Sequence, residues 1–279
     1  MSRHIGQFNP LFKAMPSEPY ATSAWKLMKK GRFNSIDVDL DSSLSVDQQM
    51  KKASKLKKEA EKWKIKILCF HSSPLSCASD AAFDIDTQIT NMKIALEYGV
   101  RFFLIHPYMS SSPDLAKLSS CQRTKHMKFN LDSISIIAKN TEKYGLRLIV
   151  ENELFTDFDF YFTLLKELPS EKCGAVLDIG HANLQLSENK IPMQDIIYHL
   201  SARLEHLHLH DNDGFTDLHV PVLHPLGTIK WNRVFKALKD VKYHGCLNEE
   251  LPPWTGNALI IWALIKRGAI PLKELWDSI

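Results

Sequence analysis

The sequence has few of the features that mark secreted or nucleic-acid-binding proteins. Only five of its 279 residues are cysteine, and no two of these cysteines form a Cys-x-x-Cys pair. An odd number of cysteines without such pairs indicates reduced thiols rather than a disulfide framework. The formal charge of +3 at pH 7 is far weaker than the basic footprint of a dedicated nucleic-acid binder.

Long hydrophobic runs are also missing from the chain. The opening MSRHIGQFNP has no apolar segment of the kind found in secretory signal peptides. The longest apolar run, residues 258–265, is too short to cross a bilayer and ends at Lys266. We therefore expect a cytoplasmic protein with no membrane partner.

Eight short aliphatic runs recur along the chain, with amphipathic stretches between them. Several runs are continuously apolar, as expected for parallel strands that helices cover. The runs span residues 4–8, 34–40, 64–70, 100–105, 146–150, 174–179, 204–209 and 245–251. Helical patterns cover residues 45–63, 86–98, 124–144, 191–203, 231–240 and 255–267. This alternation predicts an α/β fold, a (β/α)8 TIM barrel that forms one domain over residues 1–279.

Details of the loops and helix starts agree with a barrel. Ser45 and Gln48 have the spacing of a capping box at the start of a helix. No glycine-rich phosphate loop follows any aliphatic run, which argues against the rival fold, an open doubly wound sheet. Residues 9–23 and 107–123 follow predicted strands, so they are candidate substrate loops or ordinary surface loops.

Ionisable side chains stand at the ends of six successive predicted strands. They are His71, His106, Glu151, Asp178, His208 and Glu250. A barrel brings the carboxyl ends of its strands together around one axis, so these side chains are expected to converge. Histidines and carboxylates without cysteine suit zinc, manganese or iron(II) better than calcium or magnesium. One histidine at a strand end is usually unrelated to metal, but six equivalent positions in a row favour a metal site.

The stretch HLHLHDNDGFTDLH, residues 206–219, divides into parts with different roles. Alternation along a strand places His206 and His208 on one side, with His206 deeper. We expect His206 to be a hydrogen-bonded core residue and His208 to serve a metal. His210, together with the neighbouring Asp211, is expected to support the ligands. Asp217 and His219, in the following loop, are placed to complete another site.

These residues resemble the xylose isomerase-like barrels, a family that includes endonuclease IV and many sugar or sugar-phosphate isomerases and epimerases. The resemblance is most specific in IVEN (149–152), VLDIGHANL (176–184), HLHDNDGFTDLH (208–219) and EEL (249–251). It implies nine ligands for three metals: His71 and His106 for the first, Asp178, His208 and Glu250 for the second, and His181, Asp217 and His219 for the third, with Glu151 bridging. Glu249 replaces Glu250 if the strand register shifts by one.

The resemblance leaves two reaction classes open. In an isomerase or epimerase, Glu151 and Glu250 are catalytic and move a proton next to a metal-polarised carbonyl, while His181 hydrogen-bonds the substrate. In a hydrolase of the endonuclease IV type, two or three metals cleave a phosphodiester, and Asp217 and His219 are required. A non-enzymatic metal-binding barrel is a third class, against which the complete glutamate pair argues.

Departures from the family patterns bear on this choice. The glycine-rich opening of endonuclease IV is absent, and the SSP that follows His71 lacks the aromatic residue that helps the nuclease to hold DNA. Gly214 occupies the position at which epimerases resembling D-tagatose 3-epimerase carry an arginine. We expect an isomerase or epimerase with one to three zinc or manganese ions and a small carbohydrate substrate. DNA is a partner only in the hydrolase alternative, and a homo-oligomer is compatible with the sequence.

Overall fold

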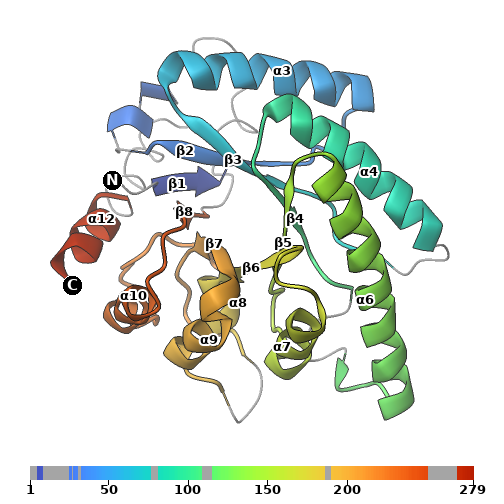
Figure 1. The fold of residues 1–279 in the computed structure, drawn as a ribbon. Coiled ribbons are helices and arrows are strands. Elements are labelled where there is room, and N and C mark those ends of the chain that lie inside the picture. The colour runs from blue at the N-terminus through green and yellow to red at the C-terminus, as the bar shows by residue number, and fades with distance from the viewer. Residues whose placement is uncertain are drawn as a thin grey trace.

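The computed structural model describes residues 5–8, 25–26, 28–30, 33–76, 81–108, 115–185, 190–250 and 269–279. Eight parallel strands each pair with the next in sequence, and β1 pairs with β8, so the sheet closes into a barrel (Figure 1). The strands are β1 Ile5–Phe8, β2 Ser35–Asp39, β3 Lys66–His71, β4 Phe102–Ile105, β5 Arg147–Glu151, β6 Cys173–Asp178, β7 Leu204–Leu209 and β8 Leu247–Glu249. The predicted TIM barrel is therefore confirmed.

Helices surround the barrel and follow the strands in sequence (Figure 1). They are α3 Val46–Trp63, α4 Ala81–Tyr98, α6 Ser120–Lys143, α7 Phe158–Glu167, α8 Ile179–Asn183, α9 Met193–Leu200, α10 Trp231–Asp240 and α12 Ala269–Ser278. None of the described helices combines the length and the apolar character needed to cross a bilayer. The capping box of Ser45 and Gln48 is present at the start of α3, as predicted.

Several boundaries differ from the sequence-based expectation. Helix α4 begins at Ala81 rather than at residue 86, and α6 begins at Ser120, inside the predicted loop 107–123. A second capping box, formed by Ser119 and Gln122, explains the early start of α6. The predicted helix 255–267 and the predicted loop 9–23 lie outside the described residues.

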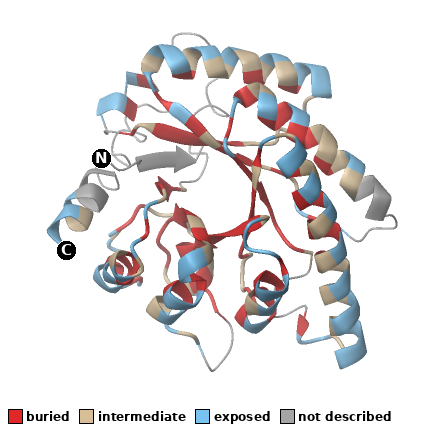
Figure 2. Cartoon of the chain, viewed as in Figure 1, coloured by how far each residue is buried: buried red, intermediate tan, exposed pale blue. Residues whose placement is uncertain are grey.

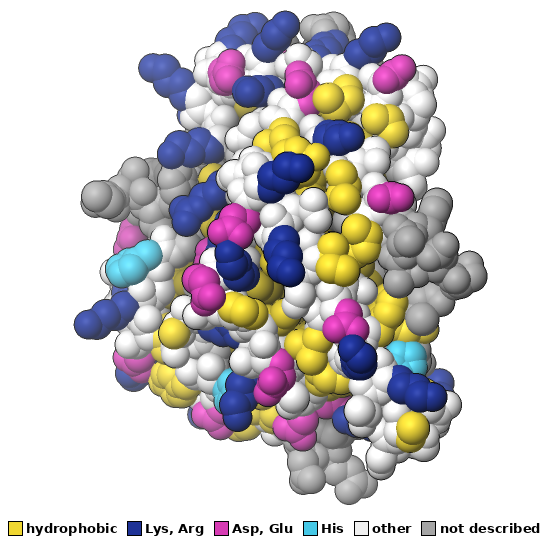
Figure 3. All heavy atoms as spheres, turned by 45° about the vertical axis from the view of Figure 1, so that its right-hand side comes forward, with side chains coloured by type: hydrophobic (Ala, Val, Ile, Leu, Met, Phe, Trp, Pro, Cys, Tyr) yellow, Lys and Arg dark blue, Asp and Glu magenta, His cyan; other side chains and the backbone are white. Residues whose placement is uncertain are grey.

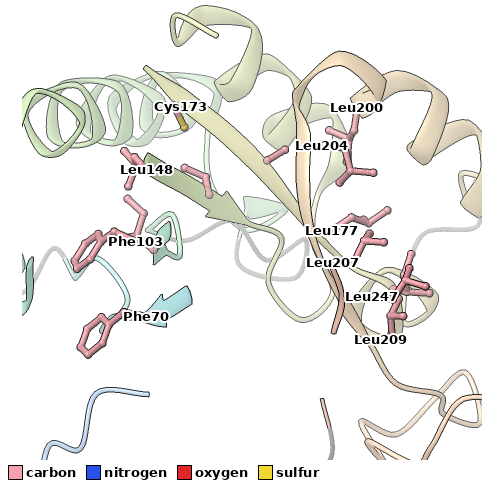
Figure 4. Packing of buried hydrophobic residues seen from close by; sticks show 14 of the residues in the cluster. Phe70, Phe103, Leu148, Cys173, Leu177, Leu200, Leu204, Leu207, Leu209 and Leu247 are labelled. Carbon is pink, nitrogen blue, oxygen red and sulfur yellow. The ribbon is translucent and has the colours of Figure 1, made fainter. Parts of the chain in front are cut away.

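The main hydrophobic core lies between the strands and the surrounding helices. Figure 2 shows β4 to β8 almost entirely buried, and α3, α6 and α10 carry their buried residues along one side. In Figure 4, Leu177, Leu207 and Leu247 from neighbouring strands gather on one side, while Phe70 lies beside Phe103. The two phenyl rings are stacked with centroids 5.9 Å apart. This layer fixes the strands against their helices and leaves the barrel axis to other side chains.

The barrel interior is apolar on one side and polar on the other. A small cluster of Cys69, Phe102, Leu104, Ile149 and Val176 comes from alternate positions of β3 to β6. On β2, β7 and β8 the buried interior positions are polar instead, with Asp37, His206 and Asn248. Because side chains alternate along a strand, the residues two positions further on reach the carboxyl end of the barrel. That end carries the predicted site.

Candidate metal centre

Four of the predicted strand-end residues form a central site at the carboxyl end of the barrel. Glu151, Asp178, His208 and Glu250 each place one potential ligand atom within 4.8 Å of the others. His208 Nδ1 lies 2.5 Å from Glu151 Oε1 and 3.3 Å from Glu250 Oε2. Three of these side chains are buried, and that of Glu250 is 13% exposed. The central site is thus deep, yet Glu250 gives it a boundary with solvent.

A second group, the histidine-pair site, adjoins the central site through Glu151. It consists of His71, His106 and Glu151. The two Nε2 atoms lie 2.5 Å apart, and Glu151 Oε2 lies 3.5 Å from His71 Nε2 and 3.3 Å from His106 Nε2. The Glu151 carboxylate faces His71 and His106 with one oxygen and His208 of the central site with the other. Glu151 therefore has the geometry of the bridging residue that the resemblance implies.

A third group, the outer site, contains His181, His210, Asp217 and His219. Asp217 Oδ2 lies 3.0 Å from His219 Nε2 and 3.6 Å from His181 Nε2. The fourth member is His210, whose Nε2 lies 3.0 Å from Asp178 Oδ1. The His210 ring stacks on the His219 ring, with centroids 3.7 Å apart. His210 was expected only to support the ligands, whereas the structure places it among the potential ligands.

Of the two consecutive glutamates, Glu250 rather than Glu249 belongs to the central site. Alternation along the backbone separates them: Glu250 faces His208, and Glu249 points away from the central site. Glu249 is fully buried, and burial raises the pKa of its carboxyl group to about 8. The register shift that would bring Glu249 into the site does not occur.

Two other residues of the 206–219 stretch, His206 and Asp211, make hydrogen bonds outside the three groups. His206 is fully buried, and its Nε2 lies 2.6 Å from Asp37 Oδ2, as expected of a hydrogen-bonded core histidine. Asp211 accepts hydrogen bonds from the Trp231 side chain at 2.7 Å and from the backbone of Thr228 and Ile229. Asp211 thereby ties the end of β7 to the start of α10, and does not support a ligand as predicted.

Three carboxylates that were not identified from the sequence stand behind the histidines. Asp39 Oδ1 lies 3.4 Å from His71 Nδ1, and Glu153 Oε1 lies 2.8 Å from His106 Nδ1. Asp37 Oδ2 lies 3.5 Å from His208 Nε2. The sequence signal was the alternation in NSIDVDL, which places Asp37 and Asp39 on one face of β2. Carboxylates in this position orient metal-binding imidazoles.

The backbone around Asp178 is fixed by local hydrogen bonds. Its carboxylate caps the short helix α8 by accepting a hydrogen bond from the His181 backbone N–H at 2.7 Å. The Asn152 side chain accepts from the Asp178 N–H at 2.8 Å and donates to the Asp178 carbonyl at 3.1 Å. The Glu-Asn pair in IVEN thus supplies one potential ligand on β5 and a brace for the ligand on β6.

Burial and opposite charges shift the pKa values of these groups in opposite directions. Burial favours neutral acids, but the charges of His181 and His210 hold the pKa of Asp178 well below its usual range. Burial disfavours protonated histidine, yet the charges of Glu151 and Glu250 raise the pKa of His208 well above its usual range. The Asp217 side chain likewise raises the pKa of His219 to about 9, against the effect of burial. A cation competes with these protons, so metal binding weakens as the pH falls.

The chemistry of the three groups fits divalent metal ions. Both Glu151 carboxylate oxygens are buried without a hydrogen bond among the described residues, although three ring nitrogens stand within 3.5 Å. A buried carboxylate is costly unless a cation or donor compensates it. Mixed nitrogen and oxygen donors suit zinc, manganese or iron(II). A metal at the central site would be held by Glu151, Asp178, His208 and Glu250.

Comparison with known proteins gives the family. The model of the xylose isomerase-like TIM barrel family matches residues 28–263. The chain belongs to this family. The family match covers the whole series of strand ends from which the three groups of side chains come.

Solved members of the fold have different activities in their names. A D-tagatose 3-epimerase-like protein aligns with a TM-score of 0.70 at 18% identity, covering 97% of this chain and 98% of that one. An L-ribulose 3-epimerase gives 0.75 at 12% identity, with 99% and 95% covered. A family 2 AP endonuclease from Brucella melitensis gives 0.68 at 13% identity, with 94% and 98% covered. These likenesses establish the fold.

The relatives found by sequence align with only part of this chain. The uncharacterized protein MJ1311 of Methanocaldococcus jannaschii is 24% identical over 185 residues, which is 63% of this chain and 56% of that protein. MJ1614 of the same organism is 25% identical over 155 residues, 54% of this chain and 55% of that protein. The chain therefore spans little more than half the length of these relatives.

Proposed function

We propose that the protein is a metal-dependent isomerase or epimerase of a small sugar or sugar phosphate. The observation that carries this proposal is the central site, in which Glu151 and Glu250 reach one point from β5 and β8. Two carboxylates on either side of a substrate suit the transfer of a proton between two faces of a carbon or between neighbouring carbons. The epimerase names of structural neighbours support the same class.

A divalent zinc or manganese ion at the central site would polarise a substrate carbonyl and acidify the neighbouring C–H. The Glu250 side chain is 13% exposed, and in this proposal it would take up the substrate proton from the solvent side. Glu151 lies deeper and would return a proton from the other side. His181, at the start of α8, is 14% exposed and would donate a hydrogen bond to a substrate oxygen.

A second candidate is the metal-dependent hydrolysis of a phosphodiester, in the manner of an AP endonuclease. The observation that favours it is the presence of all three groups, because clustered metals can clamp the attacking and leaving oxygens together. The charge distribution weighs against it. Duplex DNA is bound mainly through phosphate contacts, and in Figure 3 Asp and Glu are scattered among the Lys and Arg side chains of the face shown. The formal charge is only +3.

One paired experiment separates the two classes. We expect the manganese- or zinc-loaded protein to exchange solvent deuterium into at least one member of a panel of ketoses and ketose phosphates. We expect it not to cleave an abasic-site duplex. Glu151→Gln should lower the exchange rate at least a hundredfold, and Lys236→Gln, a surface change on α10, is the matched control. Cleavage of the duplex without any exchange would transfer the assignment to the hydrolase.

A further inference from the structure

A buried polar trio lies directly below the central site, inside the barrel. It consists of Asp37 on β2 with His206 and His208 on β7, and all three side chains are at most 1% exposed. Asp37 Oδ2 lies 2.6 Å from His206 Nε2 and 3.5 Å from His208 Nε2. One carboxylate oxygen of β2 therefore faces two histidines that enter the interior from β7.

The two ring nitrogens of His208 face different partners. Its Nδ1 lies 2.5 Å from Glu151 and 3.3 Å from Glu250, in the central site, whereas its Nε2 faces Asp37. A neutral imidazole binds metal through the nitrogen that carries no proton, and a partner on the other nitrogen fixes this choice. The carboxylate of Asp37 is an acceptor only, so with a cation on the Nδ1 side it would select the form of His208 with the proton on Nε2.

We propose that Asp37 is a positioning residue, which orients His208 and holds its proton on Nε2 so that Nδ1 is available to the central metal. This inference rests on the metal site of the proposed function. Asp37 does not touch the substrate or the reacting atoms. It acts through His208, from the layer of the barrel beneath the site.

His206 fixes the position of Asp37 in this arrangement. It donates a hydrogen bond to Asp37 from the same β7 face, one alternation below His208. Its ring packs against that of Phe102, with centroids 5.8 Å apart, so the apolar side of the interior holds the imidazole in place. A buried carboxylate without donors is strongly destabilised. His206 therefore keeps Asp37 ionised and fixed at the distance at which it can meet His208.

The trio differs from the other carboxylate–histidine pairs in its seclusion. The Asp39 side chain behind His71 is 16% exposed, and that of Glu153 behind His106 is 31% exposed. Water can replace either carboxylate as the acceptor for its histidine. Asp37 is 1% exposed, so bulk water has no access to take over its role. Loss of the Asp37 charge should thus affect the central metal more than loss of Asp39 affects its neighbour.

The test compares Asp37→Asn with the wild type and with Asp41→Asn, a matched change just beyond β2 that alters contacts with Lys52 and Ser43, away from the central site. Metal affinity is measured by competition of zinc with a chromophoric chelator at constant pH. We expect Asp37→Asn to weaken the affinity of the central site ten- to a hundredfold, and Asp41→Asn to leave it unchanged. His206→Gln, which retains a donor toward Asp37, should fall between the two.

A second readout needs no turnover. Nitrogen-15 NMR of the zinc-loaded protein should show His208 as the tautomer with its proton on Nε2 in the wild type, and a share of molecules with the other tautomer in Asp37→Asn. Unchanged affinity together with an unchanged tautomer would overturn the proposal. Loss of one whole equivalent of zinc, with the central affinity intact, would also overturn it and make the trio a metal site of its own. If the wild type binds zinc but exchanges no sugar proton, the proposed function fails while this inference stands.

Discussion

At the scale of single residues, neighbouring glutamates on β8 have opposite properties. The charge and hydrogen bond of His208 offset burial and hold the pKa of Glu250 at about 2. Burial raises the pKa of Glu249 to about 8 against a smaller lowering by the Val222 backbone, and no described side chain hydrogen-bonds its carboxylate oxygens. The chain thus keeps one charged carboxylate in the site and one neutral acid behind it.

Glu249 should make the free energy of unfolding depend on pH. Its pKa is higher in the folded state than the ordinary value of 4.5, so folding favours the protonated form. Its stability contribution is complete below pH 4.5 and is lost between about pH 4.5 and 8, by about 1.4 kcal/mol per pH unit at most. In urea unfolding, the free energy of unfolding of Glu249→Gln should rise relative to that of the wild type as the pH increases through this window. Parallel stability profiles from pH 5 to 8 would contradict the raised pKa.

At the scale of elements, the short helix α8 is shaped by its neighbour His210. A Cβ atom added at Gly180 would lie 2.0 Å from the His210 ring, too close for any side chain. The Asn212 side chain also donates to the Gly180 carbonyl at 2.8 Å. Helix α8 therefore approaches the end of β7 so closely that only glycine fits, which seats His210 between Asp178 and His219.

Gly180→Ala should therefore displace His210. We expect an overpacking cost of about 1–3 kcal/mol in unfolding experiments and a weaker metal affinity at the outer site. The matched control is Gly145→Asn, because that glycine has φ +71° and open space around its Cβ position, which asparagine tolerates. Equal metal affinity of Gly180→Ala and the wild type would show that His210 is not needed at the outer site.

The strands and their ends were predictable, because apolar runs and the ionisable residues that follow them are local in sequence. Helix α7, FDFYFTLLKE, was missed because its first five residues are mostly aromatic and show no polar face, although Asp157 caps it. Asp37 and Asp39 were missed for a different reason. The contact of Asp37 with His208 depends on which strands face one another across the closed barrel, and that of Asp39 with His71 depends on the register between the neighbouring strands β2 and β3. No local pattern carries that information.

At the scale of the whole molecule, the three groups concentrate charge where eight strands converge. Several buried carboxylates and raised-pKa histidines share one end of the barrel. Without a cation, these charges depend on one another for compensation. Bound ions should therefore stabilise the entire barrel, since the three groups together draw their potential ligands from the ends of β3 to β8 and the loop after β7.

Metal removal tests this coupling. A ligand that binds only the folded state at a hundred times its Kd adds about 2.7 kcal/mol of stability. Stripping the protein with a chelator should thus lower Tm by several degrees, and adding zinc or manganese should restore it in differential scanning calorimetry. Calcium, which prefers oxygen ligands, is the control and should restore little. The same Tm with and without zinc would contradict the site assignment.

The pairing of β1 with β8 has a consequence for folding during synthesis. Synthesis runs from the N-terminus, so β1 to β7 emerge before β8 exists. Until then β1 and β7 are open edges, and the central site lacks Glu250. The nascent chain can gather His71, His106 and Glu151, but it cannot offer the complete central set of donors. The full affinity of the central site for an ion is thus expected only after β8 has joined the barrel and Glu250 has completed the set of donors.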